Sequence, residues 1–411
     1  MSGDLSTEFA PPLDIVERYF IAAALMLALL FVLLISEPSI ILGGSVSFRT
    51  AAATHFATLG FISMVMIGAL YQMTPVILEV RIYSYPLARL QFWIYLIGTI
   101  GIIASFFFGN FKMVTVFVEI LTLAVILFAV NIGISLFRIK RWKINGVFIV
   151  LGIIHFVLAA ITANFLIASL NHNIGISFKD LLFFHIDFAA VGWLLFIIIG
   201  ALLELFPMFL LSRGYNTIPS KIGAVLLLAV IWLPVAGKLL KINIPVFFEI
   251  SLFIVSSVLI IYQVLMIYQK RMRRRLDIPL SASRAAFLFF AAAIITKVAG
   301  LSWQLAGFLF FIGFCGTLIF GQLYKIFPFL VWFHRYGSLI GKEKVPMLAD
   351  MLDSKIMRYQ EVSWYIAIAL VSIGLIAQTT APIIIGSTTA IFSIGAFAVN
   401  FKKVHRHLKT I

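Results

Sequence analysis

The chain has few charged residues and almost no cysteine. Asp, Glu, Lys and Arg together make up 11% of the 411 residues, and Cys315 is the single cysteine. A chain with one cysteine forms no internal disulfide and no multi-cysteine metal site. The rest of the composition is apolar, with 63% hydrophobic residues and a mean hydropathy of +1.11. These values exclude a soluble enzyme and indicate an integral membrane protein.

Apolar runs long enough to cross about 30 Å of hydrocarbon recur along nearly the whole chain. We predict an all-α membrane protein with about twelve membrane-spanning helices, at residues 18–36, 50–75, 88–109, 113–137, 144–170, 182–211, 219–240, 245–269, 284–301, 303–333, 362–380 and 382–401. The segment 334–361 is charged and mildly amphipathic, and Gly337, Gly341 and Pro346 interrupt it. It is predicted to be a cytoplasmic loop with a short interfacial helix.

The distribution of basic residues predicts the orientation in the membrane. If the N-terminus is cytoplasmic, most of the 31 Lys and Arg residues fall in cytoplasmic tails and loops. The outer connections then hold Arg49, Lys112, Lys179, Lys238, Lys241 and Lys297. Because loops rich in Lys and Arg stay in the cytoplasm, we expect both termini to be cytoplasmic, in a prokaryotic inner membrane. The net charge of +15 therefore reflects topology, and we expect a lipid bilayer and no nucleic acid as a partner.

One apolar segment occurs three times, at residues 54–75, 186–207 and 307–328. Aligned without gaps, the copies share Gly60, Gly192 and Gly313; Gly68, Gly200 and Gly321; Leu70, Leu202 and Leu323; and Pro75, Pro207 and Pro328. The copies are the second, sixth and tenth predicted spans. They predict three parallel four-helix repeats, at 18–137, 144–269 and 284–401, around a pseudo-threefold axis. Each glycine pair falls on one helix face, which a neighbouring helix or a flat cofactor can approach closely.

Two positions of the repeated segment carry side chains whose chemistry differs between the copies. The first position holds His55, Asp187 and Phe308, and the second, four residues after the second glycine, holds Gln72, Glu204 and Lys325. Glu204 and Lys325 can neutralise each other as a structural ion pair. Alternatively, together with Gln72, they mark a proton or ion pathway from the cytoplasm.

Three histidines lie within the predicted spans. Imidazole is a common ligand of haem iron and of copper, so His55 is a candidate haem or metal ligand, with an interhelical hydrogen bond as the alternative. His185 is the next candidate, because a carboxylate such as Asp187 can fix the tautomer of a nearby imidazole. A solvated pair facing the outside explains these two residues equally well. His155 lies in the middle of its span and is interpreted as a core histidine with satisfied hydrogen bonds.

These motifs resemble those of the catalytic subunit of the haem-copper oxidase and nitric oxide reductase superfamily. Arg49, His55, the sequence Gly-Ala-Leu-Tyr at 68–71 and Pro75 are similar to the second helix of that family, whose histidine ligates a low-spin haem b near the outer face. The sequence His-Ile-Asp-Phe-Ala-Ala-Val-Gly-Trp at 185–193 is similar to the His-x-His-x4-Gly-Trp of its tenth helix, with Asp187 in place of the second histidine.

The resemblance implies haem b on His55, with His185 and Asp187 as further cofactor-binding residues. It also implies His55 and His185 as metal ligands, copper as a second cofactor, and a respiratory or electron-transfer subunit as a partner. Two departures stand against the complete family centre: the predicted tenth span has no histidine before His334, and residues 219–240, where the family has copper ligands, have none. We therefore expect a divergent haem-binding relative that acts in redox, O2/NO or metal handling. A transporter of a small solute or proton, and a non-catalytic assembly or sensor subunit, are the alternatives.

Overall fold

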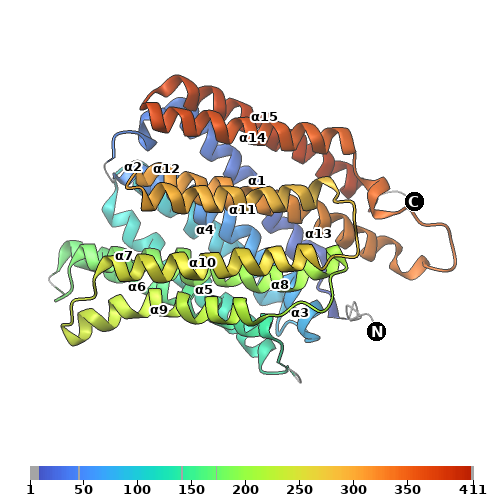
Figure 1. The fold of residues 1–411 in the computed structure, drawn as a ribbon, viewed down its shortest axis with the longest axis horizontal. Helices are drawn as coiled ribbons and strands as arrows, with labels where there is room; N and C mark the ends of the chain where they lie inside the picture. Colours follow the sequence, from blue (N-terminus) through green and yellow to red (C-terminus); the bar gives the residue numbers. More distant parts are fainter. Residues whose placement is uncertain (1–8, 45–46, 140–141, 173, 409–411) are drawn as a thin grey trace. The chain divides into compact units, whose positions relative to one another are not determined.

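The computed structural model describes residues 9–44, 47–139, 142–172 and 174–408 (Figure 1). Within these ranges the secondary structure is helical and contains no β-strand. The same ranges contain twelve helices that are long and apolar enough to cross a membrane, which confirms the predicted number. The protein is therefore built as an integral membrane protein in contact with a lipid bilayer.

The spans follow one another along the chain with short connections. In order they are α1 (Leu13–Ser36), α2–η3–α3 (Phe48–Leu78), α4 (Tyr85–Phe107), α5 (Phe111–Leu136), α6 (Ile144–Asn171), α7–η4–α8 (Phe178–Leu210), α9 (Ile218–Leu240), α10 (Val246–Gln269), α11 (Ile278–Val298), α12–η5–α13 (Trp303–Tyr336), α14 (Ser354–Ala377) and α15 (Thr380–Arg406). The three spans that contain the repeated segment are the most buried. In their most apolar windows 94%, 67% and 72% of the residues are buried, against 50% or less in each of the others.

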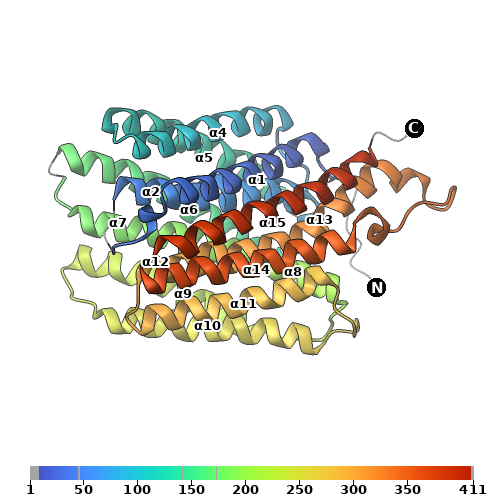
Figure 2. The same ribbon diagram turned by 90° about the horizontal axis from the view of Figure 1, so that it is seen from above.

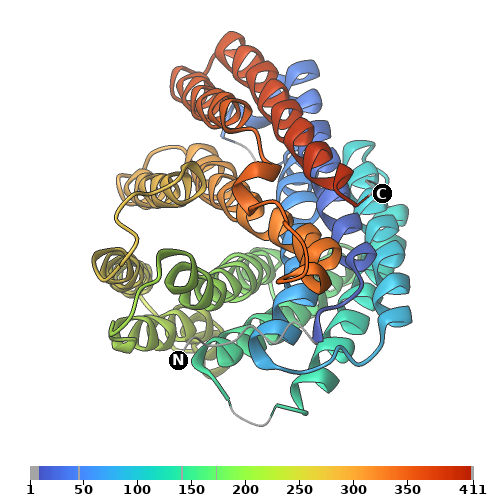
Figure 3. The same ribbon diagram turned by 90° about the vertical axis from the view of Figure 1, so that its right-hand side faces the viewer.

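The helices form two compact units. Unit 1 holds α3 from Ala69 onward, α4 up to Ser105, and α5 to α10. Unit 2 holds α1, α2, the start of α3, the last two residues of α4 (Phe106 and Phe107), and α11 to α15. Within each unit the helices run lengthwise side by side (Figures 2 and 3). In unit 1, α6 packs against α7, η4 and α8, and in unit 2, α1 packs against η3 and α15 while α11 packs against η5 and α13.

Each of the three repeated segments contains a π-helical stretch at the same place in its sequence. These stretches are η3 (Phe56–Ser63), η4 (Asp187–Leu195) and η5 (Leu309–Gly316). In the gapless alignment η3 and η5 coincide, and η4 begins one residue earlier. π-Helical turns are rare and often occur at functional positions. Here each one begins beside the aligned position that holds His55, Asp187 or Phe308.

The shared glycines lie against the helix that precedes each repeated span. A Cβ atom added at the first glycine of each copy would crowd a side-chain Cβ atom of α1, α6 or α11. These contacts are Gly60 with Met26 at 3.0 Å, Gly192 with His155 at 2.4 Å and Gly313 with Phe289 at 3.1 Å. The second glycines, Gly68, Gly200 and Gly321, lie against Tyr19, Phe148 and Pro279 of the same three helices. Close helix packing therefore accounts for both glycines, and the flat cofactor is not needed on this face.

An asparagine fixes the hairpin formed by the last two helices of the first and third predicted repeats. Asn131 of α5 accepts a hydrogen bond from the Ser84 backbone N–H at 2.9 Å and donates one to the Ser84 carbonyl at 2.9 Å. Asn400 of α15 makes the same pair of bonds with Asp353, at 2.8 and 3.2 Å. Ser84 and Asp353 lie directly before α4 and α14, so each amide ties the end of one helix to the start of its neighbour.

A related bond occurs in the hairpin of α9 and α10. The Gln263 side-chain oxygen accepts from the backbone N–H of Ser220, in the first turn of α9, at 3.4 Å. Gln263 follows Asn131 by the same number of residues that separates the first two copies of the repeated segment. All three hairpins thus carry a side-chain amide at a related place.

The segment predicted to be a cytoplasmic loop, 334–361, contains more of the flanking spans than expected. α13 continues to Tyr336, and 3-10 turns follow at Gly337–Leu339 and Leu348–Met351. α14 then begins at Ser354 rather than at residue 362. Between α13 and α14 the structure has these two turns in place of the short interfacial helix expected within 334–361. The polar side chains of the first two turns of α14 concealed this start in the sequence.

Asp353 provides a test of how α14 begins. Its carboxylate accepts hydrogen bonds from the backbone N–H groups of Lys355 at 3.0 Å and Ile356 at 3.2 Å. The bond from Ile356 is the main reason why the pKa of Asp353 lies below its usual value, with smaller contributions from the Lys355 N–H and nearby lysines. A lowered folded-state pKa means that the charge stabilises the fold above the unfolded-state pKa, about 3.9, and that this stability is lost as pH falls through the folded-state value.

We therefore expect Asp353→Asn, which can still cap the helix, to lower the unfolding temperature at pH 7. The difference from the wild type should disappear in acid, where Asp353 is protonated. Thermal unfolding in detergent at both pH values measures this effect. A loss of stability of equal size at both would contradict the assignment.

Candidate functional site

His55 ends α2, directly before the π-helical segment η3. Its Nδ1 donates a hydrogen bond to the Ala51 carbonyl at 2.7 Å. Because a carbonyl only accepts, the ring proton is on Nδ1 and the acceptor lone pair is on Nε2. Histidines that bind metals commonly make such a bond through the nitrogen that does not bind the metal. The His55 ring also contacts the Phe106 ring, with 5.3 Å between the centroids.

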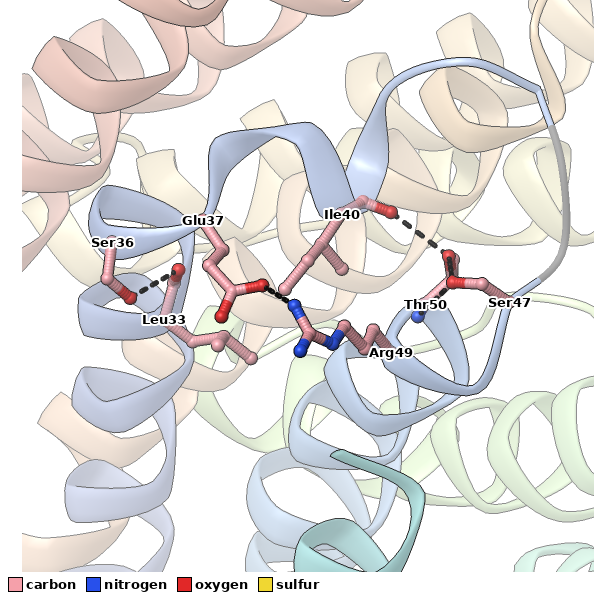
Figure 4. Close-up of polar contacts among 7 residues, drawn as sticks. All are labelled: Leu33, Ser36, Glu37, Ile40, Ser47, Arg49 and Thr50. Atoms are coloured by element: carbon pink, nitrogen blue, oxygen red, sulfur yellow. Dashed lines mark hydrogen bonds and ion pairs between the residues drawn. The ribbon is translucent and has the colours of Figure 1, made fainter. Parts of the chain in front are cut away.

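The connection between α1 and α2 is braced by polar contacts (Figure 4). Ser47 caps α2 by accepting a hydrogen bond from the Thr50 backbone N–H at 3.1 Å, and the Thr50 hydroxyl donates to the Ile40 carbonyl at 3.0 Å. Arg49 forms an ion pair with Glu37 at the end of α1. These contacts fix the start of the short helix that carries His55, and they neutralise the Arg49 charge.

His155 uses both of its ring nitrogens in unit 1. Nδ1 donates to the Leu151 carbonyl at 2.7 Å, and Nε2 accepts from the Trp232 indole N–H at 3.2 Å. Its ring stacks on Phe196, with centroids 5.7 Å apart and 12° between the planes. The residue is 1% exposed. These contacts agree with the interpretation of His155 as a core histidine and leave no ring nitrogen for a metal.

His185 and Asp187 each have a neighbour that the sequence did not indicate. The Nδ1 of His185 donates to the Ala159 carbonyl of α6 at 2.9 Å, so this backbone bond holds the ring proton on Nδ1. Asp187 is the first residue of η4. The carboxyl group of Glu249, in the first turn of α10, interacts with Asp187 electrostatically. Glu249 is not among the predicted site residues, although an acidic residue near the start of a predicted span can indicate such a position.

No metal centre forms from the described part of the chain. Within it, no three His, Cys, Asp or Glu side chains lie close enough together to hold a metal ion. His55 belongs to unit 2 and His185 to unit 1. Copper sites in proteins use several nitrogen or sulfur ligands. Within the described residues, neither histidine belongs to such a group of ligands.

Two of the three side chains predicted to form a pathway, Glu204 and Lys325, bind the start of the preceding helix. Glu204 accepts a hydrogen bond at 2.7 Å from the amide of Asn145, in the first turn of α6. Lys325 forms an ion pair with Asp277, the residue that caps α11. Mutual neutralisation of Glu204 and Lys325 is thus not needed to account for either charge. Gln72 is 5% exposed, and its side-chain oxygen has no hydrogen-bond partner among the described residues. This arrangement favours a structural role for the second polar position.

Glu361 is a buried acid that the sequence analysis assigned to a loop. It is 5% exposed and accepts hydrogen bonds from Arg358 at 3.0 Å and from the Tyr365 hydroxyl at 3.2 Å. It also lines a cavity of about 10 Å³, next to Tyr324, which is room for about one water molecule. An ionisable residue inside a membrane span is a functional candidate. In the sequence, the spacing of Arg358, Glu361 and Tyr365 places the three residues on one helix face. This pattern could have indicated that Glu361 lies in a helix and not in a loop.

His55 and His185 both carry the ring proton on Nδ1, and His55 lies directly before a π-helical segment. No protein-family model matches the chain. No curated protein matches it either. The resemblance to the haem-copper oxidase superfamily at residues 49–75 and 185–193 therefore stays a prediction from the sequence.

Proposed function

We propose that this protein is a divergent relative of the haem-copper oxidase and nitric oxide reductase catalytic subunits that binds haem b through His55. The observation that supports this most directly is the hydrogen bond from Nδ1 to the Ala51 carbonyl, because it makes Nε2 the basic nitrogen of the ring. The position of His55 beside a π-helical turn is a second support. Haem b, when bound, supplies one-electron redox chemistry and an iron that can bind O2 or NO.

The surroundings of His55 are compatible with one flat, apolar group. The glycine face of the same span is filled by α1, since a Cβ atom at Gly60 would lie 3.0 Å from the Met26 Cβ atom. On the side of His55, the span contacts the ring of Phe106, near the end of α4. The Phe106 ring stacks on the Phe48 ring, with 6.0 Å between the centroids. Aromatic side chains of this kind pack well against a porphyrin.

We also propose three parallel four-helix repeats with both termini in the cytoplasm of a prokaryotic inner membrane. The matching π-helical segments and the three hairpin amides support the repeats. The basic residues at 270–275, directly after α10, support the orientation. The role that follows is redox or O2/NO handling, with a respiratory or electron-transfer subunit as a partner. Copper is not included, because no group of three or more His, Cys, Asp or Glu side chains in the described part of the chain supports it.

The absorption spectrum of the purified protein tests this proposal. The wild type should show a Soret band, and His55→Ala should abolish it because the axial ligand is lost. His55→Met, which offers a thioether to the iron, should retain haem with a shifted band. His172→Ala, in an exposed loop, is the matched control and should leave the spectrum unchanged. A colourless wild type that takes up no added haemin, or a full Soret band in His55→Ala, would overturn the proposal.

A further inference from the structure

Unit 2 contains a cavity of about 510 Å³ at the ends of its spans, within the size range of small-molecule sites. It lies where three connections meet: α1 to α2, α11 to α12, and α14 to α15. The residues that matter for its chemistry are Gly44, Lys297, Ser302, Trp303, Gln304 and Gln378. It is separate from His55, which is not among the residues that line it.

Hydrogen bonds between the three connections hold the walls of this cavity in place. The Gln378 side-chain oxygen accepts from the Gly43 backbone N–H at 3.0 Å, and its amide nitrogen donates to the Leu375 carbonyl at 2.7 Å. The Trp303 indole N–H donates to the Gly44 carbonyl at 3.0 Å. Because the bonds of Gln378 to Gly43 and of Trp303 to Gly44 join segments that are far apart in the sequence, the cavity is a built feature of the fold.

The charge of the cavity comes from Lys297. None of the residues that line the cavity in the described part of the chain is an Asp or Glu, and Lys297 forms no ion pair there. Arg49, in the first turn of α2, is already paired with Glu37 (Figure 4). The cavity therefore has a positive charge and no acidic side chain in its described lining.

Gln304 adds a hydrogen-bond donor. Its side chain is 8% exposed, and its oxygen accepts from the Ser302 hydroxyl at 2.6 Å. Its amide nitrogen has no hydrogen-bond partner among the described residues. Buried polar groups are nearly always hydrogen-bonded in folded proteins, so this donor calls for an acceptor. A lysine and an amide N–H group together suit an oxyanion.

We propose that this cavity binds a phosphate group, with Lys297 as the counter-charge and Gln304 as a hydrogen-bond donor. Trp303 supports a place at the membrane–water boundary, where tryptophan is enriched and where lipid phosphates lie. The same chemistry has two sources, the head group of an anionic phospholipid and free phosphate. The proposal is independent of haem binding at His55.

The test compares Lys297→Gln with Lys112→Gln, a change at an exposed lysine at the start of α5. One arm adds inorganic phosphate to the protein in detergent and follows the unfolding temperature. The other compares nanodiscs of phosphatidylcholine with nanodiscs that also contain phosphatidylglycerol. Stabilisation of the wild type by phosphate identifies the free anion, and stabilisation by phosphatidylglycerol alone identifies the lipid.

In the arm that responds, Lys297→Gln should raise the apparent Kd about tenfold or more, as expected for the loss of a hydrogen bond to a charged group. Lys112→Gln should leave the response unchanged. The proposal is overturned if neither probe stabilises the wild type. It is also overturned if the two variants weaken the response equally, since that result reports general surface charge.

Discussion

Gly192→Ala is expected to destabilise the protein by about 1–3 kcal/mol, the usual effect of overpacking. The new Cβ atom would lie 2.4 Å from the Cβ and 2.5 Å from the Cγ of His155. The imidazole cannot turn away cheaply, because Leu151 and Trp232 hold its two nitrogens. The backbone of α6 must therefore move, or one of these hydrogen bonds must break, and we expect a loss near the upper end of the range.

Gly133→Ala is the matched control, and its effect should have the opposite sign. Gly133 lies inside α5, and a Cβ atom there would have no other atom within 4 Å. Alanine in an open helical position is more stable than glycine by roughly 0.5–1 kcal/mol. Equilibrium unfolding of both variants in the same detergent measures the two effects. Destabilisation of equal size in both would mean that α6 does not lie as close to Gly192 as described.

Asp277→Asn is expected to cost about 3 kcal/mol. The amide can still accept the capping hydrogen bond from the Leu280 N–H, so the main change is the loss of the charge beside Lys325. That lysine side chain is only 17% exposed. Removing one partner of a buried ion pair usually costs about 3–5 kcal/mol, and the partial exposure of both groups places this pair at the lower end.

The double variant Asp277→Asn, Lys325→Gln separates the ion pair from the cap. It should recover most of the stability, because both charges are then absent. Asp14→Asn is the control: Asp14 pairs with Arg18 in the first turn of α1, and both side chains are more exposed. That surface pair should contribute about 0–1 kcal/mol. If the double variant is no more stable than Asp277→Asn, Lys325 does not depend on Asp277 for its charge balance.

The number of spans and the repeated segment could be read from the sequence because both depend on long, local patterns. Apolar runs of about 20 residues mark a span whatever surrounds it. The shared Gly60, Gly192 and Gly313 indicated close packing, and each does lie against the preceding helix. Boundaries were less certain where a span begins with polar residues, as α14 does, and Glu361 was therefore assigned to a loop.

Side-chain partners could not be predicted in the same way. Alignment of the copies gives the depth of Glu204 and Lys325 along their helices, but not the direction in which each side chain points. Their partners, Asn145 and Asp277, come from the first turn of a neighbouring helix or its cap. The tautomer of His185 likewise depends on a carbonyl of α6, which no pattern around the histidine indicates.

The π-helical segments divide each repeated span into two parts that can change independently. A π-turn holds one more residue than an α-helical turn, and one residue corresponds to about 100° of rotation around the axis. Loss of one residue within η3 (Phe56–Ser63) would turn His55 to a different face, while Gly68 would keep its place against Tyr19. The polar position can therefore be redirected by insertion or deletion without disturbing the packed half of the helix.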